Sequence, residues 1–362
     1  MTDLLALTAE LVDIPSVSGH EQALVAHITE ALSAVPGLEL IRVGDNLVAR
    51  TQLGRPMRLV LAGHTDTVPA NGNEGARIDG DRLSGLGASD MKGGLAVMVE
   101  LARTVADPAV DVTYVFYARE EVAADRSGLL ELQEARPDLL GGDAALLGEP
   151  TSSVIEAGCQ GTMRVRITLV GERAHSARPW MGRNAVHRAA PLLTALASYV
   201  EREPVLLGCH YHEALQVVRV EGGVAGNVVP DHVELLVNHR FAPDRSPTEA
   251  IEHVRAVVEP YLDIDGGDRF EIVDVAAGAA PSVDHPLIAS IIGRNQLDVV
   301  AKLGWTDVAR FAAMGIPAAN FGPGDASIAH TAGEWVSRAE IESAFAALDD
   351  LVRIGPDPAP RS

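Results

Sequence analysis

Cysteine and lysine are scarce in this sequence of 362 residues. The two cysteines, Cys159 and Cys209, are too few for a disulfide framework, and their spacing fits no Cys-x-x-Cys metal pair. Only Lys92 and Lys302 are lysines, which excludes a lysine-rich segment that targets the nucleus or binds a membrane. No apolar run approaches the roughly 20 residues that span a bilayer. The scarcity of cysteine is typical of a protein from a reducing compartment.

Positive charge is also in short supply. The chain has 29 Lys and Arg against 50 Asp and Glu, a formal net charge of −21. Such a charge repels phosphate backbones and anionic lipids, so nucleic acids and membranes are poor partners. No Lys or Arg precedes Arg42, so the N-terminus lacks the basic segment of a secretory signal. We therefore expect a cytoplasmic protein.

Length and composition are those of a folded protein with two domains. Apolar residues make up 47% and charged residues 22%, close to the values of globular proteins. Strands alternate with helices in residues 1–161 and again in 277–362, which predicts an α/β domain on a mostly parallel sheet. Residues 162–276 instead follow the order β-α-β-β-α-β, typical of a ferredoxin-like α+β domain. We predict that this second domain is inserted into the first.

Several helix ends can also be predicted from the sequence. Leucines at helical spacing predict a first helix from about Leu4, with Thr2 as its N-cap. A helix is expected at 183–201, and a final one from Arg338 that Ser337 caps. Residues 356–362, which include three prolines, are expected to fray.

Acidic and histidine residues follow three of the predicted strands at once. The strands are 57–62, 112–118 and 144–147. The residues that follow them are His64 and Asp66, Glu120 and Glu121, and Glu149. Because ligands collect at the carboxyl ends of parallel strands, we expect these side chains to line a site.

Each of these clusters has an ordinary explanation when it is taken alone. A His-x-Asp pair is often part of a surface loop, and Asp90, between glycines, could cap the helix that follows it. Glu120 and Glu121 could be a solvated pair, although two carboxylates near a buried strand end favour a cation. Together with His330, the set offers nitrogen and oxygen ligands for two ions, and one of two adjacent carboxylates could act as a base.

The motifs resemble those of a known family. They are His64-Thr-Asp-Thr-Val-Pro69, Gly87-Ala-Ser-Asp-Met-Lys-Gly-Gly94, Glu120-Glu121, Gly148-Glu-Pro-Thr151 and His330-Thr-Ala-Gly-Glu334. In order and spacing they are similar to the co-catalytic zinc amidohydrolases and peptidases of the M20 group, over essentially the whole chain. Within that group the sequence most resembles the enzymes that desuccinylate N-succinyl-LL-2,6-diaminopimelate, in particular their actinobacterial form. Acetylornithine deacetylases and metallo-carboxypeptidases share the metal motifs and remain alternatives, as does a non-catalytic binding protein of the same fold.

The resemblance implies a role for each residue of the clusters. Two Zn²⁺ ions, which Co²⁺ could replace, would be bridged by Asp90. His64 and Glu149 would bind one ion, and Glu121 and His330 the other. Asp66 would orient His64, Glu120 would be the general base, and the peptide bond after Asp90 would be cis. The reaction would release succinate and LL-2,6-diaminopimelate for lysine and cell-wall synthesis.

The inserted domain is a lid and dimerisation domain in the M20 group, so the resemblance implies a homodimer. His175 would reach the partner subunit's site and steady the reacting oxygen. The residues that would bind the substrate are Asn227, Arg240, Thr306 and Arg310. One stretch departs from many bacterial desuccinylases, because Gly158-Cys-Gln-Gly161 stands where they carry arginines. Cys159 is expected to be a buried or substrate-lining thiol rather than a metal ligand.

Overall fold

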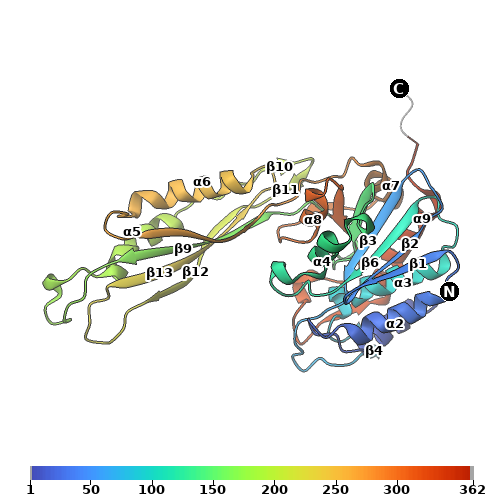
Figure 1. Ribbon diagram of the computed structural model, residues 1–362, viewed down its shortest axis with the longest axis horizontal. Helices are drawn as coiled ribbons and strands as arrows, with labels where there is room; N and C mark the ends of the chain where they lie inside the picture. The colour runs from blue at the N-terminus through green and yellow to red at the C-terminus, as the bar shows by residue number, and fades with distance from the viewer. Residues whose placement is uncertain (1, 359–362) are drawn as a thin grey trace. The chain divides into compact units, whose positions relative to one another are not determined.

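The structure is a computed structural model that describes residues 2–358 (Figure 1). It divides into two compact units, the first made of Met1–Ala157, Ser282–Val300 and Arg310–Ser362 and the second of Gly158–Pro281 and Ala301–Ala309. The domain limits expected from the sequence, 162 and 276 for the inserted domain, stay a prediction. Of the C-terminal segment expected to fray, residues 359–362 lie outside the described part.

An eight-stranded mixed sheet forms the centre of the first unit. Its strands, in spatial order, are β1 (Leu38–Val43), β2 (Asn46–Thr51), β6 (Asp111–Tyr117), β3 (Arg58–His64), β7 (Ala144–Leu147), β16 (Ala318–Asn320), β8 (Ile155–Ala157) and β15 (Val299–Ala301). Strands β6, β3, β7 and β16 run parallel to one another, which confirms the predicted α/β class. The pairs β1–β2, β2–β6 and β16–β8 are antiparallel. Every residue of β6 is buried, as expected for a strand covered on both faces.

Helices and a small second sheet complete the first unit. The helices are α1 (Leu4–Val12), α2 (Gln22–Ser33), α3 (Gly93–Thr104), α4 (Gly128–Ala135), α7 (Pro286–Asn295), α8 (Val308–Ala313) and α9 (Arg338–Ile354). The short helices within residues 2–358, in both units, are η1 (Ala88–Lys92), η2 (Ala124–Arg126), η3 (Pro137–Leu139), η4 (Pro179–Met181), η5 (Glu259–Tyr261) and η6 (Ala326–Ile328). The small sheet has the order β17 (Trp335–Ser337), β5 (Arg82–Ser84), β4 (Arg77–Asp79).

The helix ends follow local capping chemistry. Ser337 and Glu340 form a capping box at the start of α9, which confirms Ser337 as the cap. The predicted cap of α1 is wrong by one residue, because the Asp3 carboxylate, not Thr2, accepts the N–H groups of Leu5 and Ala6. A carboxylate at this position also interacts favourably with the helix dipole.

The start of α3 approaches the sheet closely. A Cβ atom on Gly94 would lie 2.2 Å from the carbonyl oxygen of Gly148, at the end of β7. Glycine is therefore required for this contact. The close packing brings η1, which contains Asp90 and precedes α3, to the carboxyl edge of β3 and β7.

The second unit has the β-α-β-β-α-β order predicted from the sequence, with an additional short hairpin after the first helix. Its elements are β9 (Gly161–Val170), α5 (Ala185–Ala197), the hairpin β10 (Val205–Leu206) and β11 (Cys209–His210), β12 (Ala214–Gly222), β13 (His232–Phe241), α6 (Pro247–Val258) and β14 (Arg269–Ala276). The sheet order is β12-β13-β9-β14, with every neighbouring pair antiparallel. Helix α5 is shorter at both ends than the predicted 183–201 and contains Pro191.

The core of the second unit lies between its sheet and helices α5 and α6, drawn on one side of the sheet in Figure 1. Met163, Val165 and Ile167 point into this core, while Arg164 between them is exposed. The alternation in β9 thus gives the strand one buried and one exposed face, as its sequence predicts.

No helix within residues 2–358 is long and apolar enough to cross a membrane.

Candidate metal centre

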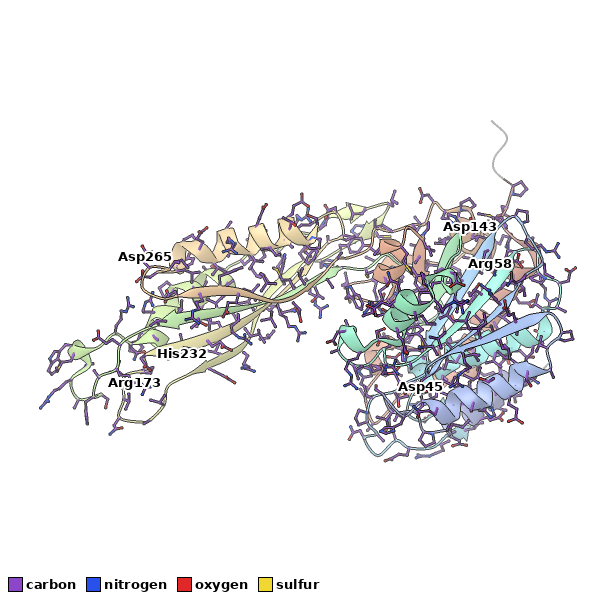
Figure 2. All side chains as sticks on the ribbon, viewed as in Figure 1. Asp45, Arg58, Asp143, Arg173, His232 and Asp265 are labelled. Carbon is purple, nitrogen blue, oxygen red and sulfur yellow. The ribbon has the colours of Figure 1, made fainter. Side chains whose placement is uncertain are left out.

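The strands β3, β6 and β7 direct polar residues to one edge of the sheet. At the opposite edge, β3 begins where Asp143 accepts the backbone N–H of Arg58, and both residues are labelled in Figure 2. At the carboxyl edge, His64 is the last residue of β3 and is 1% exposed. Glu120 and Glu121 follow β6, and Glu149 follows β7. The parallel strands thus bring together residues that are distant in the chain.

Two further chain segments complete the cluster. Asp90 lies in η1, and His330 lies in the loop between η6 and β17. Among the described residues, three groups have potential ligand atoms that all lie within 4.8 Å of one another. They are His64, Asp90 and Glu149; Asp90, Glu121 and His330; and His64, Glu120 and Glu121. His64, Asp90 and Glu121 each belong to two of the groups, and Asp90 links the group that contains His64 to the group that contains His330.

His64 is held in one orientation by its backbone surroundings. Its Nδ1 lies 3.0 Å from the carbonyl oxygen of Asp66, and its Nε2 lies 3.0 Å from Oδ1 of Asp90. Because a carbonyl can only accept, Nδ1 is the donor of this bond. In the neutral imidazole the lone pair is then on Nε2, directed at the carboxylates, the orientation that a metal ligand needs.

The carboxylate of Asp66 holds the turn that carries Glu120 and Glu121. Its two oxygens accept the backbone N–H groups of Glu120 at 2.9 Å and Glu121 at 3.0 Å, and the Ser18 hydroxyl donates at 2.7 Å. The carboxylate lies 3.6 Å from His64 Nδ1, farther than the carbonyl of the same residue. The backbone carbonyl of Asp66 therefore orients His64, while the Asp66 side chain positions the two glutamates.

The two carboxylate oxygens of Asp90 face two different histidines. Oδ1 lies 3.0 Å from His64 Nε2, and Oδ2 lies 3.6 Å from His330 Nε2. The Asp90–Met91 peptide bond is cis, as the resemblance implies. Asp90 does not cap the next helix, because the N-cap position of α3 is Lys92. The Asp90 carboxylate therefore lies between the two histidines.

Glu121 and His330 form the outer side of the cluster. His330 Nε2 lies 2.7 Å from Oε1 of Glu121, and the His330 side chain is 49% exposed while that of Glu121 is 11% exposed. His330 has a positive φ of 62°, so its backbone is in the left-handed region. Glu149, on the inner side, is 7% exposed. The cluster therefore runs from the buried sheet edge to solvent.

The cluster carries more negative than positive charge, and the histidines respond to it. The contact with the Asp90 carboxylate and the charge of Glu121 raise the pKa of His330 to about 9. Burial lowers the pKa of His64, but the contacts with Asp66 and Asp90 outweigh burial and raise it well above its usual value. Burial is also the main cause that raises the pKa of Glu121. The site therefore attracts cations, and protons on the histidines compete for it.

Sequence reasoning assigned no role to Glu334, Ser18 or Glu21. Glu334 is 1% exposed and accepts backbone N–H groups of the loop before Asp90. Glu21 is 0% exposed and accepts the backbone N–H groups of Gly19 at 2.8 Å and Arg119 at 3.2 Å. The carboxylate of Glu334 binds only backbone that is distant in the sequence, and that of Glu21 binds the nearby Gly19 as well as the distant Arg119. Only Glu334 could have been singled out, by its position inside a recognised motif.

The remaining predicted residues of the second unit lie at two ends of its sheet. His175 and Asn227 are exposed in neighbouring loops, where Ser176 N–H donates to the Asn227 carbonyl at 2.9 Å. Arg173 and His232, labelled in Figure 2, mark this end. Arg240 lies near the other end of β13, roughly 26 Å from His232 at 3.3 Å per residue. Within this unit the structure does not bring Arg240 to His175 and Asn227.

Thr306 lies just before α8, and Arg310 lies within it. Thr306 is 6% exposed, and the Arg310 guanidinium donates to the carbonyl of Ala124 at 2.7 Å, in the loop after Glu121. Cys159 is 0% exposed, and burial raises the pKa of its thiol. This agrees with the prediction of a buried thiol, which is a poor nucleophile.

Comparison of the sequence with known proteins identifies the family of the chain. The chain matches the sequence profile of Peptidase family M20/M25/M40 over residues 60–354. It is 44% identical over 354 residues to a succinyl-diaminopimelate desuccinylase of Corynebacterium glutamicum, with 96% of this chain and 95% of the relative covered. It is 48% identical over 352 residues to a Mycobacterium tuberculosis protein whose assignment as the same enzyme is provisional, with 97% of each covered.

Solved structures share the fold at low sequence identity. A tripeptidase from Staphylococcus aureus has a TM-score of 0.78 at 23% identity and covers 97% of both chains. A dinuclear metal-binding M20 peptidase from Bacillus subtilis has a TM-score of 0.71 at 18% identity and also covers 97% of both. At these identities the likeness establishes the fold.

Proposed function

We propose that this chain, which belongs to Peptidase family M20/M25/M40, is a metal-dependent hydrolase that cleaves the amide bond of N-succinyl-LL-2,6-diaminopimelate. The products are succinate and LL-2,6-diaminopimelate, which supplies lysine and cell-wall synthesis. The family supports the reaction class, and 44% identity to the Corynebacterium relative over nearly the whole chain supports the substrate. The cytoplasmic location expected from the sequence is part of the proposal.

One observation carries the proposal, namely the two residue triads that share Asp90. His64, Asp90 and Glu149 form one triad, and Asp90, Glu121 and His330 the other. The donor set fits two divalent cations, because imidazole nitrogen and carboxylate oxygen are ligands that zinc takes in catalytic sites. The carbonyl that holds His64 Nδ1 supplies the outer contact that such ligands require. We assign two Zn²⁺ to the triads, with Co²⁺ as a substitute.

Glu120 is the general base in this proposal. When bound, the cations would polarise the substrate's amide carbonyl and lower the pKa of the attacking water. Glu120 takes the proton of that water on its carboxylate and returns it to the nitrogen of the leaving amine. Asp66 keeps the Glu120 carboxylate in place, because it binds the backbone N–H groups of Glu120 and Glu121. The adjacent Glu121 would hold a cation, while Glu120 would stay available for the proton.

The second unit provides the remaining groups and the homodimer contact. His175 and Asn227 are exposed on loops at one end of its sheet, and Arg240 lies at the other end. A single small substrate cannot span that separation within one unit, so we assign His175 and Asn227 to the site of the partner subunit. There His175 donates to the oxygen that becomes negative during attack. Arg240, Thr306 and Arg310 bind the substrate, with arginine pairing its carboxylates.

The test is turnover by the purified protein loaded with Zn²⁺. N-succinyl-LL-2,6-diaminopimelate is compared with N-acetylornithine and with dipeptides at equal concentration. We expect the succinyl substrate to have the highest kcat/KM. The stretch Gly158-Cys-Gln-Gly161, which lacks the arginines of many desuccinylases, favours a less acidic substrate as the second candidate. Faster turnover of acetylornithine or of a dipeptide would show that this compound is the better substrate. If none of the compounds is turned over, the chain would be a binding protein rather than an enzyme.

A further inference from the structure

Glu334 is a buried carboxylate that binds the loop before Asp90 from the far end of the chain. Its Oε1 accepts the N–H groups of Ser89 and Asp90, each at 3.0 Å, and its Oε2 accepts that of Gly87 at 3.1 Å. Its own backbone carbonyl accepts the N–H of Gly85 at 3.2 Å. Both side-chain oxygens are therefore used within one short loop, and the side chain is almost fully shielded from water.

The backbone of the loop pairs with itself only in part. The N–H of Ala88 donates to the Gly85 carbonyl at 3.1 Å, whereas three other N–H groups of the loop donate to Glu334. Gly87 has a positive φ of 77°, and a Cβ there would lie 2.8 Å from Thr67 Cγ2, so the chain turns sharply against a neighbour. The N–H groups of Gly87, Ser89 and Asp90 converge on one point, a geometry that binds an anion. Lys92, 2% exposed, lies close enough for its charge to interact with that of Glu334. The N–H groups stabilise the buried carboxylate, although burial still raises its pKa.

Glu334 also belongs to the segment that carries His330. Its N–H donates to the Thr331 carbonyl at 3.3 Å, and Asn73 donates from its side chain to the same carbonyl at 3.1 Å. Directly after Glu334, Trp335 begins β17 and pairs with Ser84 at the end of β5. One residue therefore fastens the His330 segment to the backbone from which the Asp90 carboxylate projects.

We propose that Glu334 is a positioning residue of the metal centre, which sets the distance between the Asp90 carboxylate and the His330 imidazole by fastening their two chain segments together. It acts through Asp90 and His330 and touches neither cation nor substrate. The inference rests on the proposed metal centre, and it concerns cation binding rather than the identity of the substrate. Residues that hold ligands in this way affect metal affinity by roughly 10- to 100-fold.

The experiment compares Zn²⁺ affinity of the metal-free full-length protein, its E334Q variant and a matched control. Glutamine keeps the size of the side chain, but its NH₂ group would face the N–H of Gly87, donor against donor. The control is D111N, because Asp111 is also a buried carboxylate, 4% exposed, that accepts the backbone N–H groups of Leu53 and Arg55. Asp111 begins β6 at the edge opposite the site. Affinity is measured by competition with a chromophoric chelator, and the visible absorption spectrum of the Co²⁺-loaded proteins is recorded.

We expect E334Q to bind the more weakly held ion about 10- to 100-fold less tightly than the parent and to show an altered Co²⁺ spectrum. D111N should lose thermal stability but keep parental affinity within about threefold. Equal affinities and spectra for E334Q and the parent, or an equal loss in D111N, would overturn the inference. If E334Q does not fold, E334D, which keeps the charge but withdraws it by one methylene, is judged by the same criteria. A parent that binds no cation would instead refute the proposed function itself.

Discussion

At the scale of single residues, the site separates cation binding from proton transfer. Glu120 and Glu121 are adjacent and share a candidate group with His64, but only Glu121 is also grouped with Asp90 and His330. The Asp66 carboxylate fixes the turn on which both sit. Binding and catalysis should therefore respond differently to substitution of these two neighbours.

Replacing Glu120 by Gln should leave cation binding intact and remove the base. We expect the metal content to be unchanged and kcat to fall by about 10²- to 10⁴-fold, the contribution usual for general acid–base catalysis. Metal analysis and steady-state kinetics on the same preparation check this. E121Q is the matched comparison and should lose bound metal. Near-parental turnover by E120Q would remove Glu120 from the mechanism.

Cation affinity should rise with pH. The pKa of His330 is raised to about 9 in the metal-free protein, so the imidazole holds a proton at neutral pH that a cation must displace. Because the protonated form cannot bind metal, affinity should grow by about tenfold per pH unit for each displaced proton and level off above about pH 9. Calorimetry in buffers of different ionisation enthalpy counts the protons released. A Zn²⁺ affinity that is constant between about pH 6 and 9 would contradict this.

At the scale of the elements, the parallel strands account for how much of the site the sequence could predict. Strand ends in a parallel sheet must meet, so the positions of His64, Glu120, Glu121 and Glu149 followed from their place after apolar runs. The position of Glu334 could not be predicted, since its partners are backbone N–H groups in a loop whose conformation no side-chain pattern encodes. The separation of Arg240 from Asn227 was likewise hidden until the length of β13 was known.

The approach of α3 to β7 should be sensitive to a single methyl group. G94A would place a Cβ 2.2 Å from the Gly148 carbonyl and push η1 away from the strand ends. We expect a loss of about 1–3 kcal/mol in the free energy of unfolding and weaker Zn²⁺ binding. The control is G293A in α7, where a Cβ meets nothing within 4 Å and should be neutral or stabilising. The free energy of unfolding of both variants is measured by denaturant titration. A G94A variant as stable as the parent would show that α3 can shift without cost.

At the scale of the whole molecule, the proposed dimer makes each site depend on two chains. If Glu120 comes from one subunit and His175 from its partner, a mixture of the inactive E120Q and H175A variants contains dimers with one intact site. After subunits exchange, activity should recover to about a quarter of the parental value, because half of the dimers are mixed and each has one good site. If the activity of the mixture stays at the sum of the activities of the two separate variants, Glu120 and His175 would belong to a site formed within one subunit.

The account depends most on two cations held by the triads that share Asp90. Crystals grown with Zn²⁺ and measured at the zinc absorption edge test this directly through the anomalous difference map. Two peaks are expected, both within bonding distance of Asp90, one also contacting His64 and Glu149 and the other Glu121 and His330. A single peak, or peaks away from these residues, would contradict the account.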